Sequence, residues 1–265
     1  MKKVFNAYAS YYDQLYKDKD YEKEAKYILN LLSNHNIFSG SILDLGCGTG
    51  IHAQFMAQKG FMVHGVDISP EMVEVASNKN YGDYSKQLFF ELGDVKSCQL
   101  DKKFDAVVSL FHVASYQTSN EDLSLMFLTA SKHLNPEGIF IFDFWYGPAV
   151  LMDNPVVRVK RFNGDGVNIL RIAEPNMRVN ENIVDVNYNI MVTKEPEEEM
   201  EVLLEKHSMR YFFLPELLNA LNLAGMEYID SHSWLSSDSL SEKSWQGLII
   251  AKKTIIQKNE NSHSS

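Results

Sequence analysis

The sequence has few cysteines, a deficit of basic residues and no long hydrophobic run, and each shortage excludes a class of protein. Two cysteines, Cys47 and Cys98, cannot build a disulfide framework, and residues 1–4 do not open a secretory leader, so we expect a cytoplasmic protein. No apolar run approaches the roughly 20 residues that a membrane span needs. The formal charge of −10 disfavours nucleic acid, which proteins bind by neutralising phosphates with lysine and arginine. A membrane or nucleic-acid partner is therefore not expected.

The chain does contain enough apolar material for one substantial core. With 45% hydrophobic residues among 265, we expect a single α/β domain that carries an insertion. No metal site is predicted, and a homodimer is left open.

The clearest motif is residues 42–50, Ile-Leu-Asp-Leu-Gly-Cys-Gly-Thr-Gly. An apolar run with an acid precedes three glycines, and helical spacing resumes at residue 51, which predicts a strand, a tight turn and a helix. Glycine permits positive φ and lets a ligand lie against the main chain. The motif therefore predicts a ligand above the turn, with a plain strand–helix connection as the alternative.

Glycine spacing separates the ligands that such a turn could bind. The dinucleotide fingerprint needs a further glycine where Ile51 stands, and the phosphate-loop pattern needs a Gly-Lys-Ser/Thr that is missing. The remaining Asp-x-Gly-x-Gly-x-Gly pattern resembles the class I S-adenosylmethionine (SAM)-dependent methyltransferases. That resemblance implies SAM as cofactor, S-adenosyl-L-homocysteine as product, and donor contacts from Asp44, Gly46, Cys47, Gly48 and Gly50.

Two later acids follow predicted strands. Residues 61–68 predict a second strand that ends in Asp67, and residues 88–95 predict a third that ends in Asp94. In a parallel sheet Asp67 would lie beside the glycine turn and accept both ribose hydroxyls. Asp94 would accept the adenine amino group, or is an ordinary turn residue. The side chains expected to cover the adenine ring are Ile68, Met72 and Val95.

The rest of the first half alternates between strand and helix patterns. Residues 103–112 predict a buried strand, 121–133 a helix, 135–138 a turn and 139–144 a further strand. This alternation predicts a doubly wound sheet, in which ligands bind at the carboxyl ends of the strands. By that rule one crevice is lined by Asp44, Asp67, Asp94, His112 and Asp143.

The pattern changes after residue 144. Residues 156–162, 167–172, 183–192 and 200–209 predict extended segments, and 214–223, 227–231 and 247–252 predict a helix and two closing strands. The fold class is thus α/β: a doubly wound, Rossmann-like, seven-stranded methyltransferase sheet with an inserted antiparallel β layer. The expected parts are an N-terminal helical lid (1–34), the SAM-binding core (35–144), the inserted substrate layer (145–212), the closing helix and strands (213–253) and a polar tail (254–265).

Phenols and charges alternate over residues 8–21, whereas residues 21–32 predict an amphipathic helix. The first stretch resembles the lid of small-molecule methyltransferases, which folds over the methyl donor. The resemblance implies cofactor contacts from Tyr12, Lys19 and Tyr21 and a substrate contact from Tyr8. Core packing of these aromatics is the alternative.

Further segments resemble the nucleotide-linked amino-sugar N-methyltransferases. They are the lid, Leu110-Phe111 with Tyr116, Phe144-Trp145-Tyr146, and Glu205-Lys206-His207. The resemblance implies that Tyr116 lies near the substrate amine, that Leu110 contacts the cofactor, and that Trp145 and Tyr146 contact the substrate. The chain departs from that family in a shorter loop at 16–21 and in His112, where a serine is usual.

An amine must lose a proton before it can accept a methyl group. The candidate proton acceptors are Tyr116, His112 and His207, with hydrogen-bonded packing as the alternative for each histidine. The expected activity is therefore N-methylation of a small molecule. The alternatives are an O-methyltransferase of a sugar or similar metabolite, a catalytically silent SAM-binding protein and, least expected, a nicotinamide oxidoreductase.

Basic residues concentrate in the inserted layer of this acidic protein, at Arg158, Lys160, Arg161, Arg171 and Arg178. Guanidinium groups match phosphates in a bidentate way. We therefore expect Arg158, Arg171 and Arg210 to hold an anionic substrate, such as a phosphate or a nucleotide-sugar pyrophosphate. The alternative is that these side chains are solvated strand faces.

Overall fold

A computed structural model describes residues 9–164, 166–194 and 200–254. Tyr8, most of the acidic run at 195–201 and the tail from 257 onward lie outside the described residues. Among the described helices, none combines the length and the apolar character that crossing a membrane requires.

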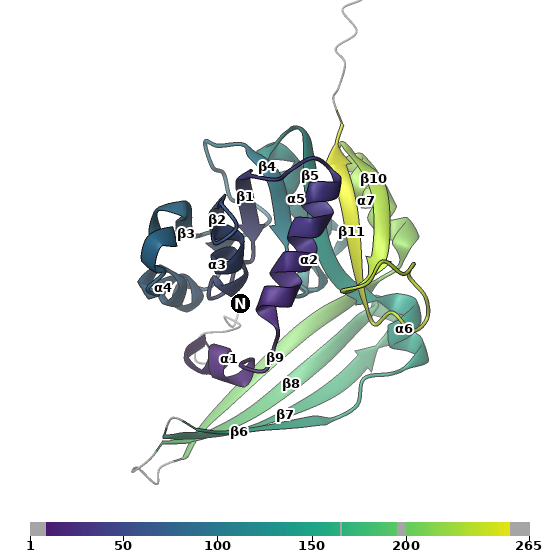
Figure 1. Ribbon diagram of the computed structural model, residues 1–265. Helices are drawn as coiled ribbons and strands as arrows, with labels where there is room; N and C mark the ends of the chain where they lie inside the picture. Colours follow the sequence, from purple (N-terminus) through teal and green to yellow (C-terminus); the bar gives the residue numbers. More distant parts are fainter. Residues whose placement is uncertain (1–8, 165, 195–199, 255–265) are drawn as a thin grey trace, which may run out of the picture.

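The centre of the fold is a seven-stranded sheet with the strand order β3-β2-β1-β4-β5-β11-β10 (Figure 1). The first five strands pair in parallel, and β11 pairs antiparallel with both β5 and β10. This confirms the predicted fold class. The strands are β1 (Gly40–Leu45), β2 (Phe61–Asp67), β3 (Leu88–Leu92), β4 (Phe104–Ser109), β5 (Leu134–Tyr146), β10 (Met226–Ser233) and β11 (Gln246–Lys253).

Alternate residues of β5 show how the sheet is covered on both faces. Phe140 and Phe142 pack in the core cluster beneath two helices, whereas Ile139 and Ile141 pack in the cluster beneath two others. The first face is covered by α5 (Asn120–His133) and α7 (Leu214–Leu223), and the second by α2 (Tyr21–Asn34) and α3 (Ile51–Ala57). The remaining helical segments are α1 (Ala9–Leu15), α4 (Pro70–Asn78), η1 (Gly82–Gln87), η2 (Ala114–Tyr116), α6 (Gly147–Met152) and η3 (Val179–Glu181).

Local signals begin these helices where the sequence places them. The Ser69 hydroxyl accepts the N–H of Met72 at 3.2 Å, and Pro70 opens α4. The predicted turn at 135–138 is wrong, because these residues lie inside β5. Pairing with β4 continues on both sides of them, so the Asn-Pro-Glu-Gly segment forms a bulge, with Glu137 at φ 67°, instead of ending a strand.

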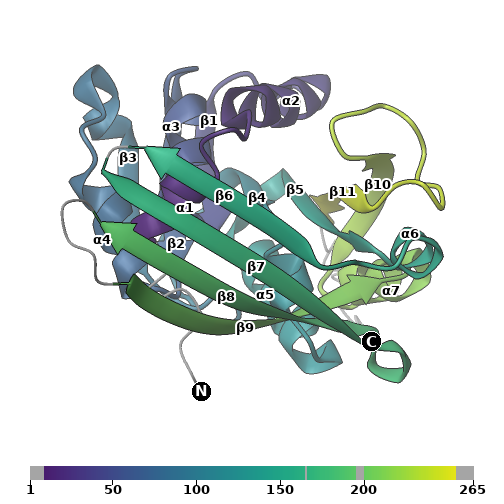
Figure 2. The same ribbon diagram turned by 90° about the horizontal axis from the view of Figure 1, so that it is seen from below.

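The inserted layer is a four-stranded antiparallel sheet in the order β9-β8-β7-β6 (Figure 2). Its strands are β6 (Arg158–Gly164), β7 (Val167–Arg178), β8 (Ile183–Lys194) and β9 (Met200–Phe212). All four extended segments predicted for this region are confirmed, and β7 is longer than predicted. The layer joins the central sheet where β9 pairs with the end of β5, at Trp145↔Tyr211 and Tyr146↔Phe212.

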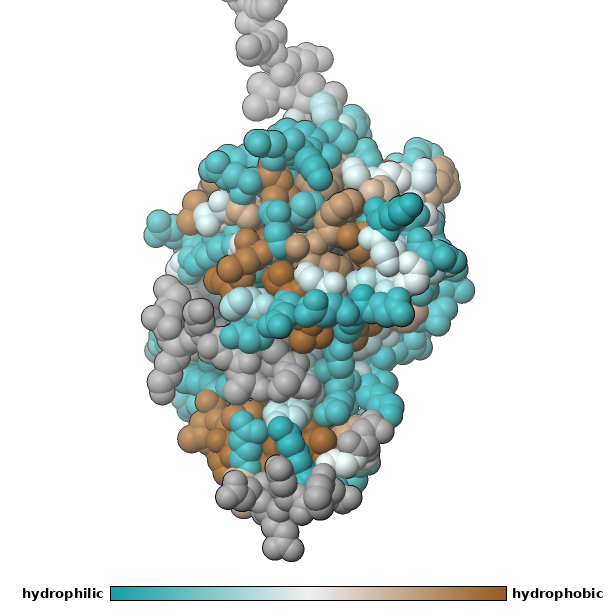
Figure 3. Space-filling view, turned by 90° about the vertical axis from the view of Figure 1, so that its left-hand side faces the viewer, coloured by the Kyte–Doolittle hydropathy of each residue, from teal (hydrophilic) through white to brown (hydrophobic). Residues whose placement is uncertain are grey.

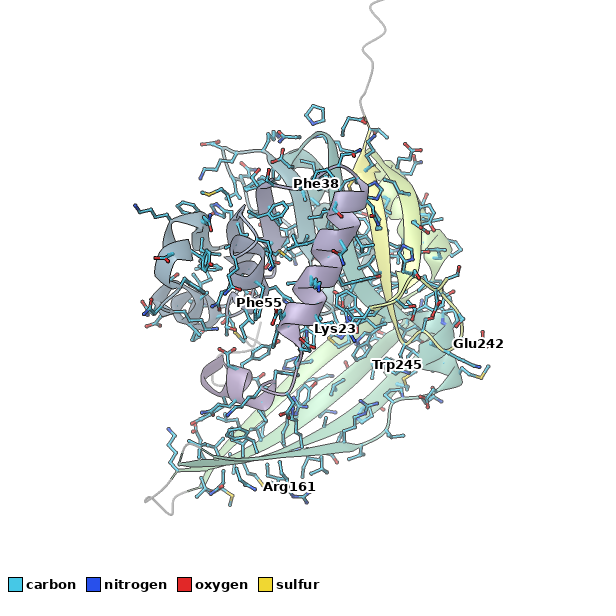
Figure 4. All side chains as sticks on the ribbon, in the orientation of Figure 1. Lys23, Phe38, Phe55, Arg161, Glu242 and Trp245 are labelled. Atoms are coloured by element: carbon cyan, nitrogen blue, oxygen red, sulfur yellow. The ribbon has the colours of Figure 1, made fainter. Side chains whose placement is uncertain are left out.

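Side chains alternate between two faces of this layer, which we call inner and outer. The inner face packs against α1 through Ile169, Ile190 and Val192. By the strand register it also carries Lys160, Arg171, Tyr188, Glu205 and His207. The outer face carries Arg161, Arg178 and Arg210, and in Figure 4 the Arg161 side chain points away from α1.

Candidate active site

The glycine turn after β1 has the backbone that its sequence predicts. Gly46, Gly48 and Gly50 have φ angles of 85°, 55° and 76°, a region that favours glycine. The N–H of Gly46 donates to the carbonyl of Val66 at 2.7 Å, which fixes the turn to β2. A Cβ at Gly46 would meet Val113 Cγ2 at 2.4 Å, whereas a Cβ at Gly48 would meet nothing within 4 Å. The main chain at Gly48 is thus open for a ligand to lie against.

Two carboxylates converge on this turn. Asp67 Oδ2 accepts the N–H of Gly48 at 2.8 Å, and its Oδ1 accepts the N–H of Ser69 at 2.9 Å. Burial nevertheless raises the pKa of Asp67 above its usual value. Burial, and then the charge of Asp67, raise the pKa of Asp44 to about 7. The turn therefore holds one buried acid, Asp44, and one partly buried acid, Asp67, that a positively charged ligand would stabilise.

The other residues predicted to contact the cofactor differ in exposure. Ile68 is 62% exposed beside Asp67, so it offers an apolar surface to a ring. The side chains of Cys47, Met72, Val95 and Leu110 are buried. Asp94 accepts the N–H of Lys96 at 2.9 Å. Contact of these residues with a cofactor stays a prediction.

The lid segment is tied directly to the glycine turn. Asp13 Oδ1 accepts the Thr49 hydroxyl at 2.6 Å, and Asp13 Oδ2 lies 2.8 Å from Lys79 Nζ. Lys79 Nζ also donates to the carbonyl of Thr49 at 2.8 Å. Sequence reasoning missed Thr49 and Lys79, because no local pattern links them to Asp13. Through these bonds α1 lies over the turn.

Lys19 lies at the base of the lid in a buried ionic cluster. Its ammonium pairs with Glu24 and lies 4.3 Å from the ring centres of both Tyr21 and Phe111. Glu24 is also 2.7 Å from His52 Nε2. Burial lowers the pKa of Lys19, and although burial alone would raise that of Glu24, His52 and Lys19 together lower it. Where the lid meets the site, the Lys19 ammonium is thus largely removed from water and lies between two aromatic rings.

The segment after β4 is strained. Phe111 and His112 have φ angles of 65° and 68°, which bulky side chains rarely adopt. The fully buried Asp143 holds this conformation by accepting the N–H of His112 at 3.0 Å, and its Oδ2 lies 2.9 Å from His112 Nδ1. Gln246 Nε2 donates to the same carboxylate at 2.6 Å. Such strain is typical of functional segments.

Tyr116, His207 and Glu205 form a hydrogen-bonded chain. The Tyr116 hydroxyl lies 2.6 Å from His207 Nδ1, and His207 Nε2 lies 2.8 Å from Glu205 Oε2. His207 is only 2% exposed, and its ring lies 4.8 Å from that of Tyr188. Because the Glu205 carboxylate accepts a hydrogen bond at Nε2, it favours the His207 tautomer that is protonated on Nε2. Nδ1 is then free to accept a hydrogen bond from the Tyr116 hydroxyl. The chain can therefore take a proton at Tyr116.

Contacts continue from this chain to the lid. The guanidinium of Arg171 lies 5.2 Å from the Tyr188 ring, and its Nη1 donates to the Tyr16 hydroxyl at 3.1 Å. The Tyr16 ring in turn lies 5.1 Å from that of Phe111 and 4.7 Å from that of Tyr12. The proton-accepting chain and the glycine turn therefore belong to one connected wall.

The two aromatic residues predicted to contact the substrate lie on opposite faces of β5. Trp145 lies 5.9 Å from the His112 ring, on the side of Tyr116. Tyr146 points the other way and packs beside Phe144 in the core cluster under α5 and α7, as a correction to the prediction.

Arg210 is a second correction. It lies on the outer face, where its Nη2 contacts Asn120 at 2.7 Å and Glu216 at 2.5 Å. It thus joins two helices of the core and does not face the site. Arg158 is exposed near the start of edge strand β6, and Arg171 remains on the inner face.

Comparisons with known proteins agree with this geometry. Residues 42–138 match the family described as "Methyltransferase domain". The dTDP-3-amino-3,4,6-trideoxy-alpha-D-glucopyranose N,N-dimethyltransferase of Streptomyces venezuelae is 27% identical over 84% of this chain and 92% of its own. The sugar N-methyltransferase KedS8 from Streptoalloteichus shares the fold, with a TM-score of 0.79, 19% identity and coverage of 96% of this chain and 94% of its own. Residues 42–138 thus carry a methyltransferase domain, and the chain as a whole resembles SAM-dependent methyltransferases.

The magnesium-protoporphyrin O-methyltransferase of Rhodobacter capsulatus is also similar to this methyltransferase, with 26% identity over 50% of this chain and 66% of its own. The SAM cofactor fits the turn described above. Gly48 leaves open main chain where a Cβ would intrude, and the buried Asp44 and partly buried Asp67 suit a cationic ligand that carries ribose hydroxyls.

Proposed function

We propose that this methyltransferase transfers the methyl group of SAM to the amine of a small, nucleotide-linked sugar. The observation that carries the proposal is the extent of the similarity. The amino-sugar N,N-dimethyltransferase matches 84% of the chain, well beyond residues 42–138, whereas the O-methyltransferase matches 50%. Similarity to the amino-sugar enzyme therefore includes parts that a donor domain alone does not need.

The donor would be held by the glycine turn and its two acids. Asp67 would accept the ribose hydroxyls, Gly48 would lie under the ligand, and the lid held by Asp13 would exclude water. When bound, SAM supplies a methyl group on a sulfonium, and its transfer to a nitrogen lone pair leaves S-adenosyl-L-homocysteine. The protein's main task is to hold the amine in line with that methyl group.

Tyr116 would take the proton that the amine must lose. An alkylammonium with a pKa of about 10 has no lone pair at neutral pH. Its proton would pass to the Tyr116 oxygen while the phenol proton passes to His207 Nδ1, and Glu205 would hold the resulting imidazolium through Nε2. The amine nitrogen is then neutral, and the charge lies within a buried ion pair. Sequence reasoning assigned no role to Glu205, although its spacing of two from His207 places both on one face of a strand.

The inner face also offers cations for an anionic acceptor. Arg171 lies on this face near the rings of Tyr16 and Tyr188, and Lys160 is its cross-strand partner on β6. Lys160 Nζ is 3.7 Å from Asp18, a weak and exposed pair that a phosphate could replace. These two residues, with Arg158 at the edge, are the proposed phosphate contacts.

Methyl transfer from isotopically labelled SAM to matched acceptors tests the proposal. The acceptors are a dTDP-linked 3-amino-sugar, the same sugar with a hydroxyl in place of the amine, and the free amino-sugar. We expect labelled N-methyl product from the first, little from the free sugar and none from the hydroxyl analogue. Methylation of the hydroxyl analogue would favour the O-methyltransferase alternative, and calorimetric SAM binding without any product would favour a silent binding protein.

A further inference from the structure

A single carboxylate fixes both the main chain and the ring of His112. Both oxygens of Asp143 lie 3.0 Å from the His112 main-chain nitrogen, and Oδ2 also lies 2.9 Å from the ring nitrogen Nδ1. Asp143 is itself fully buried and accepts a hydrogen bond from Gln246. The ring of His112 is therefore held in one place, at a φ angle of 68° that a bulky side chain rarely adopts.

The contact with Asp143 decides which nitrogen of the His112 ring is available. A carboxylate beside Nδ1 favours the tautomer that is protonated there, which leaves a lone pair on Nε2. Nδ1 is buried, whereas the side chain as a whole keeps 19% of its surface exposed. Among the residues that the structure describes, none is hydrogen-bonded to Nε2. His112 thus offers a hydrogen-bond acceptor that the described part of the chain does not use.

The His112 ring lies between the lid and Tyr116. Its aromatic neighbours are Phe111, whose ring centre is 5.3 Å away, and Trp145, at 5.9 Å. The Phe111 ring contacts Tyr16 of the lid segment, and Trp145 packs in the same cluster as Tyr116. His112 is therefore part of the wall that joins the glycine turn to the proposed proton acceptor.

His112 lies at the end of the central sheet that faces the inserted layer. Figure 1 and Figure 3 both show this layer below the central sheet. Strand β9 pairs with residues 145–146 at the carboxyl end of β5, and His112 follows the neighbouring parallel strand β4. Ligands of doubly wound sheets bind at this end. A substrate held between the sheet and the layer would therefore lie beside His112.

We propose that His112 determines specificity by accepting, at Nε2, a hydrogen bond from a hydroxyl group of the acceptor sugar. The hydroxyl lies on a ring carbon next to the one that bears the amine. This inference rests on the proposed function, because it takes Tyr116 as the group that receives the amine proton. A nitrogen that only accepts is matched by a group that donates, and a sugar hydroxyl is such a donor.

The spacing of His112 and Tyr116 explains why the hydroxyl is placed next to the amine. The Ser115 N–H donates to the His112 carbonyl at 2.9 Å, so a single tight turn joins His112 to Tyr116. An amine and a hydroxyl on adjacent carbons project from the same edge of a sugar. The amine can therefore face Tyr116 while the hydroxyl faces His112.

The kcat/KM for matched acceptors, measured with isotopically labelled SAM, tests the inference. The parent acceptor is a dTDP-linked 3-amino-sugar with hydroxyls on carbons 2 and 4, and it is compared with its 2-deoxy and 4-deoxy analogues. We expect one analogue to have a kcat/KM about tenfold below that of the parent, because it cannot donate the hydrogen bond. The loss is moderate because water can reach the partly exposed ring.

Two variants of His112 should remove this preference. His112→Gly deletes the ring, and glycine adopts the positive φ readily, so the main-chain bond to Asp143 is kept. His112→Phe keeps a ring between Phe111 and Trp145 but has no lone pair. Each variant should use the parent and the discriminated analogue about equally well. A purely structural role for His112 would instead lower kcat/KM for all three sugars by the same factor.

Asn36→Gly is the matched control. Asn36 is an exposed residue with a φ angle of 64° that follows α2, so glycine there relieves the same backbone conformation away from the site. This variant should keep the preference of the unaltered enzyme. Thermal melting of all three variants shows that each is folded.

Three results would overturn the inference. One is an equal kcat/KM for the parent and both analogues with the unaltered enzyme. Another is a preference that both His112 variants retain. The third is loss of transfer to every sugar in folded His112→Gly, which would assign the proton transfer to His112. If the unaltered enzyme methylates none of the sugars, the proposed function fails and this inference fails with it, whereas equal transfer to all three overturns this inference alone.

Discussion

The hydroxyl of Tyr116 and Nδ1 of His207 lie 2.6 Å apart, although 91 positions separate the two residues in the chain. One follows a strand of the central sheet and the other lies on the inserted layer. Their contact therefore forms only when the inserted layer packs against the central sheet. The proposed proton acceptor is complete only once both parts have folded.

Tyr116→Phe should slow methyl transfer because it removes the first proton acceptor and leaves the ring in place. We expect kcat to fall by about 10²-fold, a typical contribution of a positioned acid or base, with the Kd for SAM unchanged. The rate of the variant should rise with pH, since the amine must then lose its proton to water. Tyr228→Phe, which loses only a bond to Ser231 on the closing strand β10, is the matched control.

Glu205→Gln separates a positioning role from mere packing. If Glu205 sets the tautomer of His207, the amide should shift the pH profile toward that of Tyr116→Phe while leaving the KM for SAM unaltered. Glu174→Gln, on the outer face, should leave the profile in place. Equal profiles for Glu205→Gln and the unaltered enzyme would remove the proton chain from the mechanism and leave simple positioning of the amine.

Two glycines with the same backbone offer a matched test of the donor site. Gly48 and Gly82 have φ angles of 55° and 56°, and a Cβ at either would meet no atom within 4 Å. Alanine at each should cost about 1 kcal/mol of stability, because left-handed backbone disfavours a Cβ. Only Gly48→Ala should also weaken SAM binding, by at least about tenfold, since its methyl would occupy the ligand's space. Calorimetry and thermal melting measure the two effects, and equal SAM affinities would place the donor elsewhere.

Features that depend on a short stretch of residues were predictable from the sequence. The turn at Gly46 and the acid at Asp67 follow from glycine spacing and from a strand that ends in a carboxylate, and both occupy their expected places. The face on which a strand residue lies was not predictable, because a shift of one residue in register reverses it. Arg171 and Arg210 looked alike in the sequence, yet only Arg171 lies on the inner face.

Long-range contacts and strain left no local signal. The bond between Thr49 and Asp13 joins a turn to a lid through folding alone, and the positive φ of His112 occurs without glycine. The carboxylate of Asp143 imposes that conformation from the next strand. Residues of this kind are recognised only after the strands are placed side by side.

Asp13→Ala should loosen the lid without unfolding the protein. It removes the bond to Thr49 and the ion pair with Lys79, which is partly exposed and contributes at most about 1 kcal/mol to stability. We expect SAM to dissociate about tenfold faster, measured by stopped flow, because closing contacts govern dissociation more than encounter. Asp18→Ala, which removes a side chain that is 87% exposed, is the control. Equal dissociation rates for the two variants would show that α1 does not retain the donor.

The raised pKa of Asp44 makes donor binding depend on pH. With a pKa of about 7, caused by burial and then by Asp67, Asp44 is mostly protonated at pH 6 in the free enzyme. In the free protein this protonation favours the folded state at low pH, so stability should fall as pH rises from about 4 to about 7. A donor cation beside Asp44 favours the carboxylate, so SAM binding should release about one proton at pH 6 and almost none at pH 9.

Calorimetry in two buffers of different ionisation enthalpy measures that release. SAM affinity should accordingly rise with pH up to pH 7, by at most about tenfold per unit. Asp44→Asn should lose both the proton release and the pH dependence, because an amide does not titrate. Asp94→Asn should retain both, since Asp94 follows β3, two strands away from the β1 strand that carries Asp44. Undiminished proton release by Asp44→Asn would mean that the cation of the donor lies beside a different acid, and Asp67 would then be the carboxylate to test.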